Sequence, residues 1–477
     1  MSILNDSRRN FIKLMGFLGA GTLAGCHQDV SSKSKKNELD IDKIPSRAQG
    51  ASYMGDFAAP KVATVRCAFI GAGSRGAGHI EQIAEIEGTE VVAISDLYED
   101  LAKKSAGVCK EKGGGQRHKD IALYFGDEHL WKKMLTEVQP DIVFVITPWN
   151  LHAPMAIEAM KQGAHVFVEV PLAVTIQELW DIVDTSEQTQ KHCMMMENVN
   201  YGREELIYLN MCRQGVIGEL LHGEAAYIHE LRSQMEEVER GTGSWRTYEY
   251  AKRNGNLYPT HGLGPVAQYF NLARGEDNFA RLVSFSSPAK GRQLYAAKNF
   301  DQDHQWNQLD FKGGDINTSI IKTTLGRTVL VQWDETSPRP YDRLNLIQGT
   351  KGILAGFPNR IALEGGVDNV SSDHHEWVEG DQLAEIFEKY EHPLYKRLGA
   401  LAEKMGGHGG MDFIMRYRII ECIRQGLPLD QNVYEGCYWS AVGPLSEDSV
   451  AQDGMPQTFP DFTRGDWKKT SPLSIIA

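Results

Sequence analysis

The sequence predicts an α/β protein with two domains: an N-terminal Rossmann domain with a doubly wound parallel sheet, and a C-terminal α+β domain. Three observations support this class. The chain has 477 residues, which is too long for one ordinary domain. A glycine-rich turn stands between an apolar strand and a helix near residue 71. Short apolar runs and helical patterns then continue as far as residue 200, as in a buried parallel sheet.

Residues 1–26 are predicted to direct export rather than to fold. Arg8 and Arg9 precede an apolar stretch, Leu14–Ala24, and a Leu-Ala-Gly box stands directly before Cys26. This order resembles a twin-arginine export signal with a lipoprotein cleavage site, whereas a short core helix with basic flanks by chance is the alternative. We expect a periplasmic or cell-surface protein, anchored to a membrane through a lipid on Cys26, with residues 27–60 as a tether.

Charge, hydropathy and cysteine spacing exclude several kinds of partner. The formal net charge is −13, from 50 basic and 63 acidic residues, so the surface repels a phosphate backbone and no nucleic-acid partner is expected. No apolar run reaches about 18 residues, which leaves the lipid as the predicted membrane contact. Cysteines other than Cys26 show neither a C-x-x-C pair nor a zinc spacing, so no metal site is predicted.

Residues 61–200 are predicted to form a domain that binds a dinucleotide. The apolar run Val62–Ile70 predicts a strand, and Gly71, Gly73 and Gly76 follow it at the spacing G-x-G-x-x-G, before a helical pattern begins. Glycines at these positions allow a tight turn and a close approach of the backbone to a pyrophosphate. The helix N-terminus then offers its amides and a partial positive charge to the phosphates.

An acidic residue at the end of the second predicted strand indicates which nicotinamide cofactor is bound. Asp96 ends the run Glu90–Asp96 and stands 20 positions after Gly76. A carboxylate there suits the ribose hydroxyls of NAD and repels the additional phosphate of NADP. The alternative for Asp96 is a cap on the following helix.

Two further predicted strands end in polar or aromatic side chains. Residues 141–147 and 164–171 are apolar runs, and Trp149, His152 and Glu169 stand at their C-terminal ends. Ligands of doubly wound sheets bind at the carboxyl ends of the strands, so these side chains are candidate cofactor contacts. Each one alone is also explained by packing or capping. One more strand is expected at residues 193–199.

Residues 201–477 are predicted to form a second, substrate-binding domain of α+β type. Strands are expected within residues 223–228, 284–286 and 327–333, and helices at residues 261–272 and 411–425. The segment 406–412 is rich in glycine and contains His408, which suggests a flexible connector or a loop over the active site.

The order of the motifs resembles a known superfamily. The segments GAGSRG, ISD, TPWNLH and EVP are similar to those of the glucose–fructose oxidoreductase and inositol dehydrogenase superfamily. Downstream, ENVNY, GELLHGE, a Trp-Arg pair and YPTHGLGP resemble glycoside hydrolase family 109, the NAD-dependent α-N-acetylgalactosaminidases. The resemblance covers about residues 60 to 470. It implies that the second domain contains a large open mixed sheet and that homodimers are possible.

The resemblance also implies the site residues. Those that match the NAD site, including the glycines already described, are Gly71, Gly73, Ser74, Arg75, Gly76, Asp96, Trp149, Asn150, Leu151, His152, Glu169, Val170 and Asn198. Those that match the sugar site are Tyr227, Arg246, Tyr258, Pro259, Thr260, His261 and Tyr341. His261 is the preferred catalytic base, because imidazole titrates near neutral pH, and Tyr258 and Tyr341 are candidate acids, bases or hydroxyl ligands. Packing of Tyr258 in a loop and a surface ion pair for Arg246 are the alternatives.

Two departures from the superfamily argue against a simple dehydrogenase. Val170 stands where those enzymes usually have a lysine, and Leu257 stands where they often have an aspartate, four residues before His261. Oxidation of a hydroxyl needs a proton relay, and two of its three usual members are replaced. The alternatives are an NAD-dependent sugar or inositol dehydrogenase and a non-enzymatic sugar-binding lipoprotein.

The hypothesis that fits both the motifs and the export signal is hydrolysis by elimination. NAD⁺ oxidises C3 of the sugar, a base removes the acidified proton from C2, the glycosidic oxygen leaves C1, water adds, and C3 is reduced again. Such a glycosidase does not need two carboxylates at the bond. NAD is then recycled in each turnover, so a tightly bound cofactor suffices outside the cytoplasm, and the partner is a small glycoside or a glycan terminus.

Overall fold

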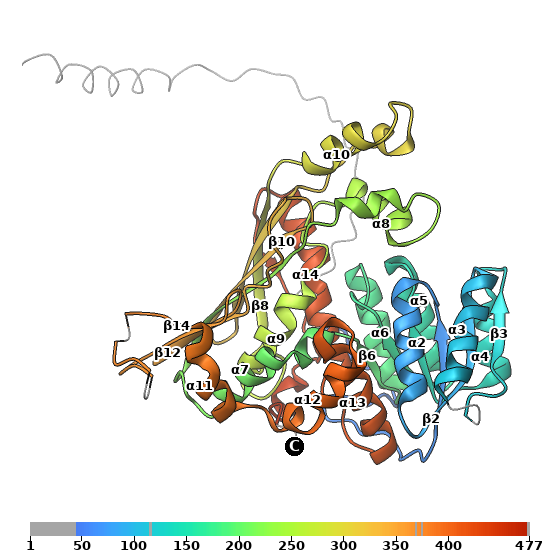
Figure 1. The fold of residues 1–477 in the computed structure, drawn as a ribbon, viewed down its shortest axis with the longest axis horizontal. Coiled ribbons are helices and arrows are strands. Elements are labelled where there is room, and N and C mark those ends of the chain that lie inside the picture. Colours follow the sequence, from blue (N-terminus) through green and yellow to red (C-terminus); the bar gives the residue numbers. More distant parts are fainter. Residues whose placement is uncertain (1–43, 114–116, 368–369, 374, 475–477) are drawn as a thin grey trace, which may run out of the picture. The chain divides into compact units, whose positions relative to one another are not determined.

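A computed structural model describes residues 44–113, 117–367, 370–373 and 375–474 and contains two β-sheets (Figure 1). The first sheet has six parallel strands and the second has nine strands of mixed direction, which confirms the predicted fold class. The predicted signal and Cys26 lie outside the described residues. Within them, no helix is long and apolar enough to cross a membrane.

The six-stranded sheet has the order β3-β2-β1-β4-β5-β6, with every pair of neighbours parallel. The order reverses between β1 and β4, which is the switch point where doubly wound sheets bind ligands. The half-buried edge strand β3 escaped the sequence analysis, and β6 is shorter than the expected strand at 193–199. The strands are β1 (Val65–Ile70), β2 (Thr89–Asp96), β3 (Ala122–Phe125), β4 (Ile142–Val145), β5 (His165–Val168) and β6 (Cys193–Met195).

Helices alternate with these strands, as parallel pairing requires. A capping box of Thr175 and Glu178 begins one of them. After β6 the chain forms a 3₁₀ turn, η1 (Asn198–Tyr201), because the Glu197 side chain accepts a hydrogen bond from the amide of Val199 and ends the extended backbone. The helices are α2 (Ser74–Glu85), α3 (Glu99–Lys112), α4 (Leu130–Val138), α5 (Trp149–Lys161), α6 (Ile176–Thr189) and α7 (Arg203–Arg213).

The nine-stranded sheet has the order β14-β13-β12-β11-β7-β10-β9-β8-β15. Its only parallel pair among the described strands is β7 with β10, and the others are antiparallel. The strands are β7 (Leu220–Ile228), β8 (Phe279–Ser286), β9 (Ile316–Thr323), β10 (Thr328–Asp334), β11 (Leu346–Gly349), β12 (Gly352–Ala355), β13 (Arg360–Leu363), β14 (Val378–Glu379) and β15 (Gln457–Thr458).

Helices of the second domain pack on this sheet or return to the first domain. The helix expected at 261–272 begins one residue earlier and ends at Phe270, because Asn271 adopts a left-handed conformation (φ 54°). The α-helices are α8 (Thr242–Lys252), α9 (Thr260–Phe270), α10 (Gly291–Asn299), α11 (Ala384–Tyr390), α12 (Pro393–Met405), α13 (Met411–Gln425) and α14 (Val433–Ala451). The 3₁₀ turns are η2 (Arg232–Glu236), η3 (Gln305–Gln308), η4 (Gly380–Leu383), η5 (His408–Gly410) and η6 (Asp466–Lys469).

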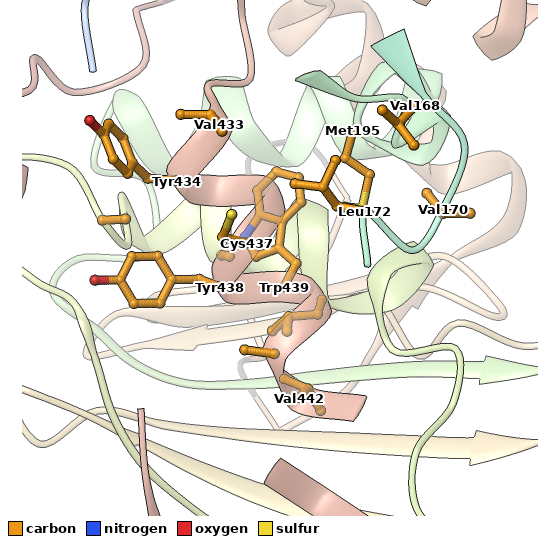
Figure 2. Close-up of a cluster of buried hydrophobic side chains, with 14 of the residues drawn as sticks. Val168, Val170, Leu172, Met195, Val433, Tyr434, Cys437, Tyr438, Trp439 and Val442 are labelled. Atoms are coloured by element: carbon orange, nitrogen blue, oxygen red, sulfur yellow. The ribbon is translucent and has the colours of Figure 1, made fainter. Parts of the chain in front are cut away.

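Helix α14 belongs to the core of both domains (Figure 2). Trp439 is fully buried and lies in one apolar cluster with Leu172 and Met195, which follow β5 and end β6. The hydroxyl of Ser440 accepts a hydrogen bond from the Leu172 amide at 3.0 Å. The same helix contacts β8 of the second sheet. The carboxyl ends of β5 and β6 are therefore fixed to the second domain.

Residues 44–60, which we expected to belong to the tether, pack on the folded protein instead. Arg47 forms ion pairs with Glu187 of α6 and Asp466 of η6. The ring of Tyr53 stacks on Tyr434 of α14 at 4.8 Å. Ion pairs and stacking of this kind fix the segment to both domains, so a tether reaching residue 60 is wrong at its C-terminal end.

Candidate active site

The glycine turn between β1 and α2 leaves open space where a pyrophosphate is expected. Gly71 has φ +99°, and a Cβ atom there would lie 2.1 Å from the carbonyl oxygen of Ile146. A Cβ at Gly76 would lie 2.3 Å from the carbonyl oxygen of Gly71, whereas a Cβ at Gly73 would meet nothing within 4 Å. Two glycines are thus needed to close the turn, and the third faces free space at the N-terminus of α2. The turn fits the pyrophosphate of a dinucleotide.

Asp96 is fixed beside this turn by two backbone amides. Its Oδ2 accepts a hydrogen bond from Ala72 N at 2.6 Å, and its Oδ1 accepts one from Tyr98 N at 2.8 Å. The first residue before α3 is Tyr98, and no side-chain cap bonds to that helix. Asp96 is therefore not the N-cap of α3, and its place at the end of β2 suits a ribose.

The side chain of Arg75 connects three segments of the site. Its Nε donates to Glu169 Oε1 at 2.7 Å, and its two terminal nitrogens donate to the Asp412 carboxylate at 2.6 and 3.1 Å. The guanidinium charge is thus balanced by carboxylates from the loop after β5 and from α13. In this arrangement, Ser74 and Arg75 are placed to meet a phosphate through their backbone amides.

Asp412 is a site residue that the sequence analysis missed. Besides Arg75, it accepts hydrogen bonds from Asn198 Nδ2 at 2.7 Å and from His408 Nδ1 at 2.8 Å. Burial alone would raise the pKa of Asp412, but the hydrogen bond from His408 and the charge of Arg75 hold it well below its usual range. The only sequence signal was the glycine-rich segment before it, which indicated a loop over the site.

Glu169 is held in its charged form beneath the turn. His79 Nδ1 accepts a hydrogen bond from Arg416 Nε at 2.8 Å, so its Nε2 carries the proton and donates to Glu169 Oε1 at 2.7 Å. Burial, and next the charge of Arg416, lower the pKa of His79 to about 3, and the ring is therefore neutral. Burial opposes ionisation of Glu169, but Arg75 and His79 keep the pKa of this carboxyl below its ordinary value.

The remaining predicted cofactor residues differ in exposure. Trp149 is buried at the start of α5, whereas Asn150 and Leu151 are exposed, and Val170 is buried. The two ring nitrogens of buried His152 lie 2.7 Å from Pro171 O and 2.8 Å from Thr147 O. His152 thus joins the backbone at the ends of β4 and β5, so any effect on a cofactor passes through that backbone.

His261 and Glu197 form a hydrogen-bonded pair at the carboxyl end of the parallel sheet. His261 Nδ1 lies 2.7 Å from Glu197 Oε1, and the Glu197 side chain is fully buried. A Cβ at Gly264 would lie 2.9 Å from Glu197 Cγ, and one at Gly262 would lie 2.3 Å from Ala226 N. These two glycines let α9 pack closely on η1 and β7, which brings His261 to the acid. The carboxylate beside His261 therefore comes from Glu197 and not from position 257, where the superfamily often has an aspartate and this chain has Leu257.

Tyrosine rings surround His261. Tyr227 of β7 lies 5.2 Å from the His261 ring, Tyr258 lies 4.9 Å from it, and the two tyrosine rings are 4.7 Å apart. Burial raises the pKa of Tyr258 and of Tyr227 well above the ordinary value, so both phenols keep their protons. The predicted sugar-site residues of β7 and α9 therefore meet in one cluster.

Arg246 lies against the same aromatic cluster. Its guanidinium carbon is 4.9 Å from the Trp149 ring centre and 5.3 Å from that of Tyr258. No carboxylate forms an ion pair with it among the residues that the structure describes, so a surface ion pair does not explain its place. Pro259 precedes α9, and Tyr341 is 6.2 Å from Tyr227 and accepts a hydrogen bond from Arg343.

Several buried polar atoms without a hydrogen-bond partner lie in this part of the described structure. Native interiors leave few such atoms, and those at functional sites are often completed by a ligand. Within residues 44–474 as described, they include Glu197 Oε2, Asn198 Oδ1, Asn200 Oδ1, Arg246 Nε and Thr260 Oγ1. The same part of the chain holds no cluster of three side chains suited to a metal ion.

Comparisons with known proteins cover both domains. Residues 201–469 match the family described as "Glycosyl hydrolase 109, C-terminal domain", and residues 65–197 match "Oxidoreductase family, NAD-binding Rossmann fold". Two relatives from Akkermansia muciniphila, named glycosyl hydrolase family 109 proteins 1 and 2, are 62% and 54% identical and align over at least 99% of both chains. A glycosyl hydrolase family 109 protein from a Shewanella species is 52% identical over 99% of each chain.

Solved structures share the fold at low identity. A levoglucosan dehydrogenase in complex with NADH and levoglucosan has a TM-score of 0.61 at 17% identity and covers 83% of this chain and 100% of its own. A scyllo-inositol dehydrogenase from Lactobacillus casei with bound NAD(H) and scyllo-inositol has a TM-score of 0.57 at 12% identity over 83% and 99% of the two chains. At these identities the likeness concerns the fold.

Proposed function

This chain belongs to glycosyl hydrolase family 109, and we propose that it hydrolyses terminal α-N-acetylgalactosamine from a glycoside with an NAD cofactor that it retains. The observation that carries the proposal is the His261–Glu197 pair among tyrosines at the carboxyl edge of a Rossmann sheet. The carboxylate of Glu197 is buried and bonded to the imidazole. It is therefore placed to orient a base rather than to attack a glycosidic bond.

The residues around the turn fit the cofactor. The pyrophosphate would lie in the open space at Gly73, and the ribose would bind to Asp96. The unpartnered amide oxygen of Asn198 would bind the nicotinamide end. When bound, NAD⁺ supplies reversible oxidation of C3 of the sugar, and the resulting carbonyl acidifies the proton on C2.

His261 is the proposed base for the C2 proton. Hydrogen bonding of Nδ1 to Glu197 fixes the ring and places the lone pair on Nε2, which has no hydrogen-bond partner among the described residues. Removal of the C2 proton leaves an electron pair that forms the C1–C2 double bond while the glycosidic oxygen leaves C1. Addition of water across this bond then places OH on C1 and returns a proton to C2.

The tyrosines and Arg246 complete the proposed sugar site. Because the raised pKa of Tyr258 keeps its phenol protonated, Tyr258 serves as a proton donor to the departing oxygen rather than as a base. The Arg246 guanidinium, with its unpartnered Nε, is proposed to bind the N-acetyl carbonyl or the sugar hydroxyls.

The experiment that tests this proposal uses a methyl or aryl α-N-acetylgalactosaminide deuterated at C2. Elimination predicts that cleavage in H₂O replaces the deuterium with hydrogen, while absorbance at 340 nm shows no accumulation of NADH. Cleavage that retains all of the deuterium rules out the elimination.

A sugar dehydrogenase is the second candidate, since a histidine bonded to a carboxylate also serves oxidation of a hydroxyl. Against it, Val170 offers no proton-carrying side chain at the end of β5. The two candidates separate in one assay. A dehydrogenase reduces added NAD⁺ in proportion to free sugar, and the proposed hydrolase releases free sugar without net reduction.

We also propose that the protein works outside the cytoplasm, anchored through Cys26. The support is the order of Arg8, Arg9, the apolar stretch and the Leu-Ala-Gly-Cys box. Twin-arginine export carries folded proteins, so NAD bound in the cytoplasm would leave with the enzyme. A cofactor that is regenerated in every turnover needs no external supply.

A further inference from the structure

Five aromatic rings form a continuous row that leads out of the proposed sugar site. Each ring contacts the next, with centre-to-centre distances of 6.0, 4.7, 6.2 and 5.8 Å. In order, the rings are Trp149, Tyr258, Tyr227, Tyr341 and Phe357. The row begins at the carboxyl end of the parallel sheet and ends at the loop between β12 and β13.

Exposure changes sharply along this row. The first three side chains, Trp149, Tyr258 and Tyr227, are 2%, 8% and 8% exposed, and the last two, Tyr341 and Phe357, are 40% and 36% exposed. Tyr258 and Tyr227 surround His261 and, with Tyr341, belong to the proposed sugar site, whereas Trp149 is a candidate cofactor contact one ring away. The outer two rings carry exposed apolar surface beside the same site, which suits the binding of a ligand.

The outer two rings stand on backbone that is strained and tied together. Phe357 has φ 53°, and Leu344, close after Tyr341, has φ 60°. Bulky residues adopt the left-handed region rarely, and such strain clusters at ligand clamps. The Gly356 amide donates to the carbonyl oxygens of Leu344 at 3.0 Å and Asn345 at 3.2 Å, so the two strained loops support each other.

Arg343 fixes the two rings relative to each other. Its guanidinium carbon lies 5.4 Å from the Tyr341 ring centre and 4.9 Å from that of Phe357, and it donates to the Tyr341 hydroxyl at 2.9 Å. Glu205 accepts a 2.7 Å hydrogen bond from Arg343 and holds this cation in place. The planes of the two rings meet at 67°, which makes a rigid aromatic corner.

We propose that Tyr341 and Phe357 form a second sugar-binding surface, for the sugar unit to which the terminal residue is attached. The inference rests on the proposed glycosidase function and deepens it, because it assigns a binding surface to the sugar unit of the leaving group. The C–H groups on one face of a pyranose carry a slight positive charge and are attracted to the negative face of an aromatic ring. Tyr341 and Phe357 offer such ring faces beside the Arg343 cation. Both rings lie outside the buried rings around His261, which suits the sugar that leaves from C1.

The test compares two substrates with the same terminal sugar: methyl α-N-acetylgalactosaminide and a disaccharide in which galactose replaces the methyl group. A nitrophenyl glycoside is not a suitable reference, because its own ring would stack on the corner. In the parent protein, kcat/KM for the disaccharide is expected to exceed that for the methyl glycoside. Phe357→Asn should reduce this advantage about fivefold, as expected for the loss of one aromatic contact.

Asparagine is chosen because it accepts the left-handed backbone at residue 357. The matched control is Phe285→Ala on β8, which removes an exposed aromatic side chain from the same sheet, four strands away from β11. The control should leave the ratio between the two substrates unchanged. If Phe357→Asn folds with the parent's melting temperature and also keeps the parent's ratio, Phe357 only packs and the proposal is wrong.

A binding measurement separates this proposal from the glycosidase function. Calorimetry with the protein loaded with NADH, which cannot oxidise the sugar, gives the Kd of each ligand without turnover. Tighter binding of the disaccharide, lost in Phe357→Asn, supports the second sugar surface even if the parent protein cleaves neither glycoside, in which case the proposed function alone fails. Equal Kd values for the two ligands in the parent overturn the surface.

Discussion

His261 Nδ1 lies 2.7 Å from Oε1 of Glu197, whose side chain is fully buried at the end of β6. The pair joins the two domains, since Glu197 follows the last strand of the parallel sheet and His261 lies in the first turn of α9 on the mixed sheet. A buried carboxylate beside one ring nitrogen fixes both the tautomer and the orientation of the imidazole.

Removing the charge of Glu197 should impair catalysis more than binding. In Glu197→Gln the ring of His261 loses its ionic partner. We expect kcat to fall about 10- to 100-fold, the range found when carboxylate partners that orient metal-binding histidines are removed. KM and the amount of bound NAD should change little. Steady-state kinetics and the NAD content of the purified variant check this, and an unchanged kcat would remove Glu197 from the mechanism.

Asp412 should control retention of the cofactor. Asp412→Asn removes the charge that holds Arg75 and Asn198 together, so the first turn of α2 and η1 lose a shared anchor. NAD should then dissociate on the order of tenfold faster. Stopped-flow fluorescence of bound NADH measures the rate. Glu421→Gln, which weakens ion pairs in the last turns of the same helix, is the control and should release NADH at the parent's rate.

If Asp412→Asn does not fold, Arg75→Lys carries the same test. Lysine keeps the positive charge but cannot bond to Glu169 and both oxygens of Asp412 at once. A dissociation rate equal to the parent's in a folded variant would show that these contacts stabilise the fold without holding NAD.

Replacing Gly73 should affect NAD binding, whereas replacing Gly76 should affect the stability of the fold. Gly73→Ala places a methyl group in open space, so the protein should keep its melting temperature and lose NAD binding. Gly76→Ala places a methyl group 2.3 Å from the Gly71 carbonyl oxygen and should lower the melting temperature itself. Thermal unfolding without NAD and NAD titration of each variant check this. Normal NAD affinity in Gly73→Ala would contradict the assignment of that space to the pyrophosphate.

Acid should destabilise the fold through buried histidines. Burial lowers the pKa of His165 to about 4 and that of His192 to about 3, and their rings lie 5.1 Å apart. Both pKa values in the folded protein lie below the ordinary 6.5, so the unfolded chain takes up protons first as the pH falls. The free energy of unfolding is therefore unaffected by these histidines above pH 6.5 and decreases as the pH falls toward 4. At pH 5 the loss should be on the order of 2 kcal/mol for each histidine.

Melting temperatures between pH 8 and pH 4.5 measure this dependence. His192→Phe removes one titrating ring, which makes no hydrogen bond to the described residues. In this variant the melting temperature should decrease less as the pH falls below 6.5. A parent melting temperature that does not change between pH 7 and pH 5 would contradict the prediction.

The export signal can be tested on the intact chain. Replacing Arg8 and Arg9 by lysine should keep the protein in the cytoplasm, because the twin-arginine pair is the feature that the export route reads. Cys26→Ser should allow export but remove the lipid, so the protein should move from the membrane to the soluble fraction. Cell fractionation and the mass of the mature N-terminus check both outcomes.

Much of the Rossmann domain could be predicted because its signals are local. The strand, the three glycines and Asp96 lie within about 30 residues, and backbone geometry alone requires glycine at Gly71 and Gly76. The second domain was harder to predict. Short strands such as β11 to β14 carry few residues each and are stabilised by pairing along the sheet, which no local pattern encodes.

The sequence by itself determined the two-domain class, the cofactor turn, the acid that suits NAD and the block around His261. Only the tertiary structure revealed two further carboxylates of the site, Asp412 and Glu197. Asp412 stands 337 residues after Arg75, and Glu197 stands 64 residues before His261. Each acid is an ordinary residue in its own segment. It becomes part of the site because α14 and the glycines of α9 bring the two domains together at the ends of β5 and β6. Burial there makes the charge of each acid depend on its polar partners.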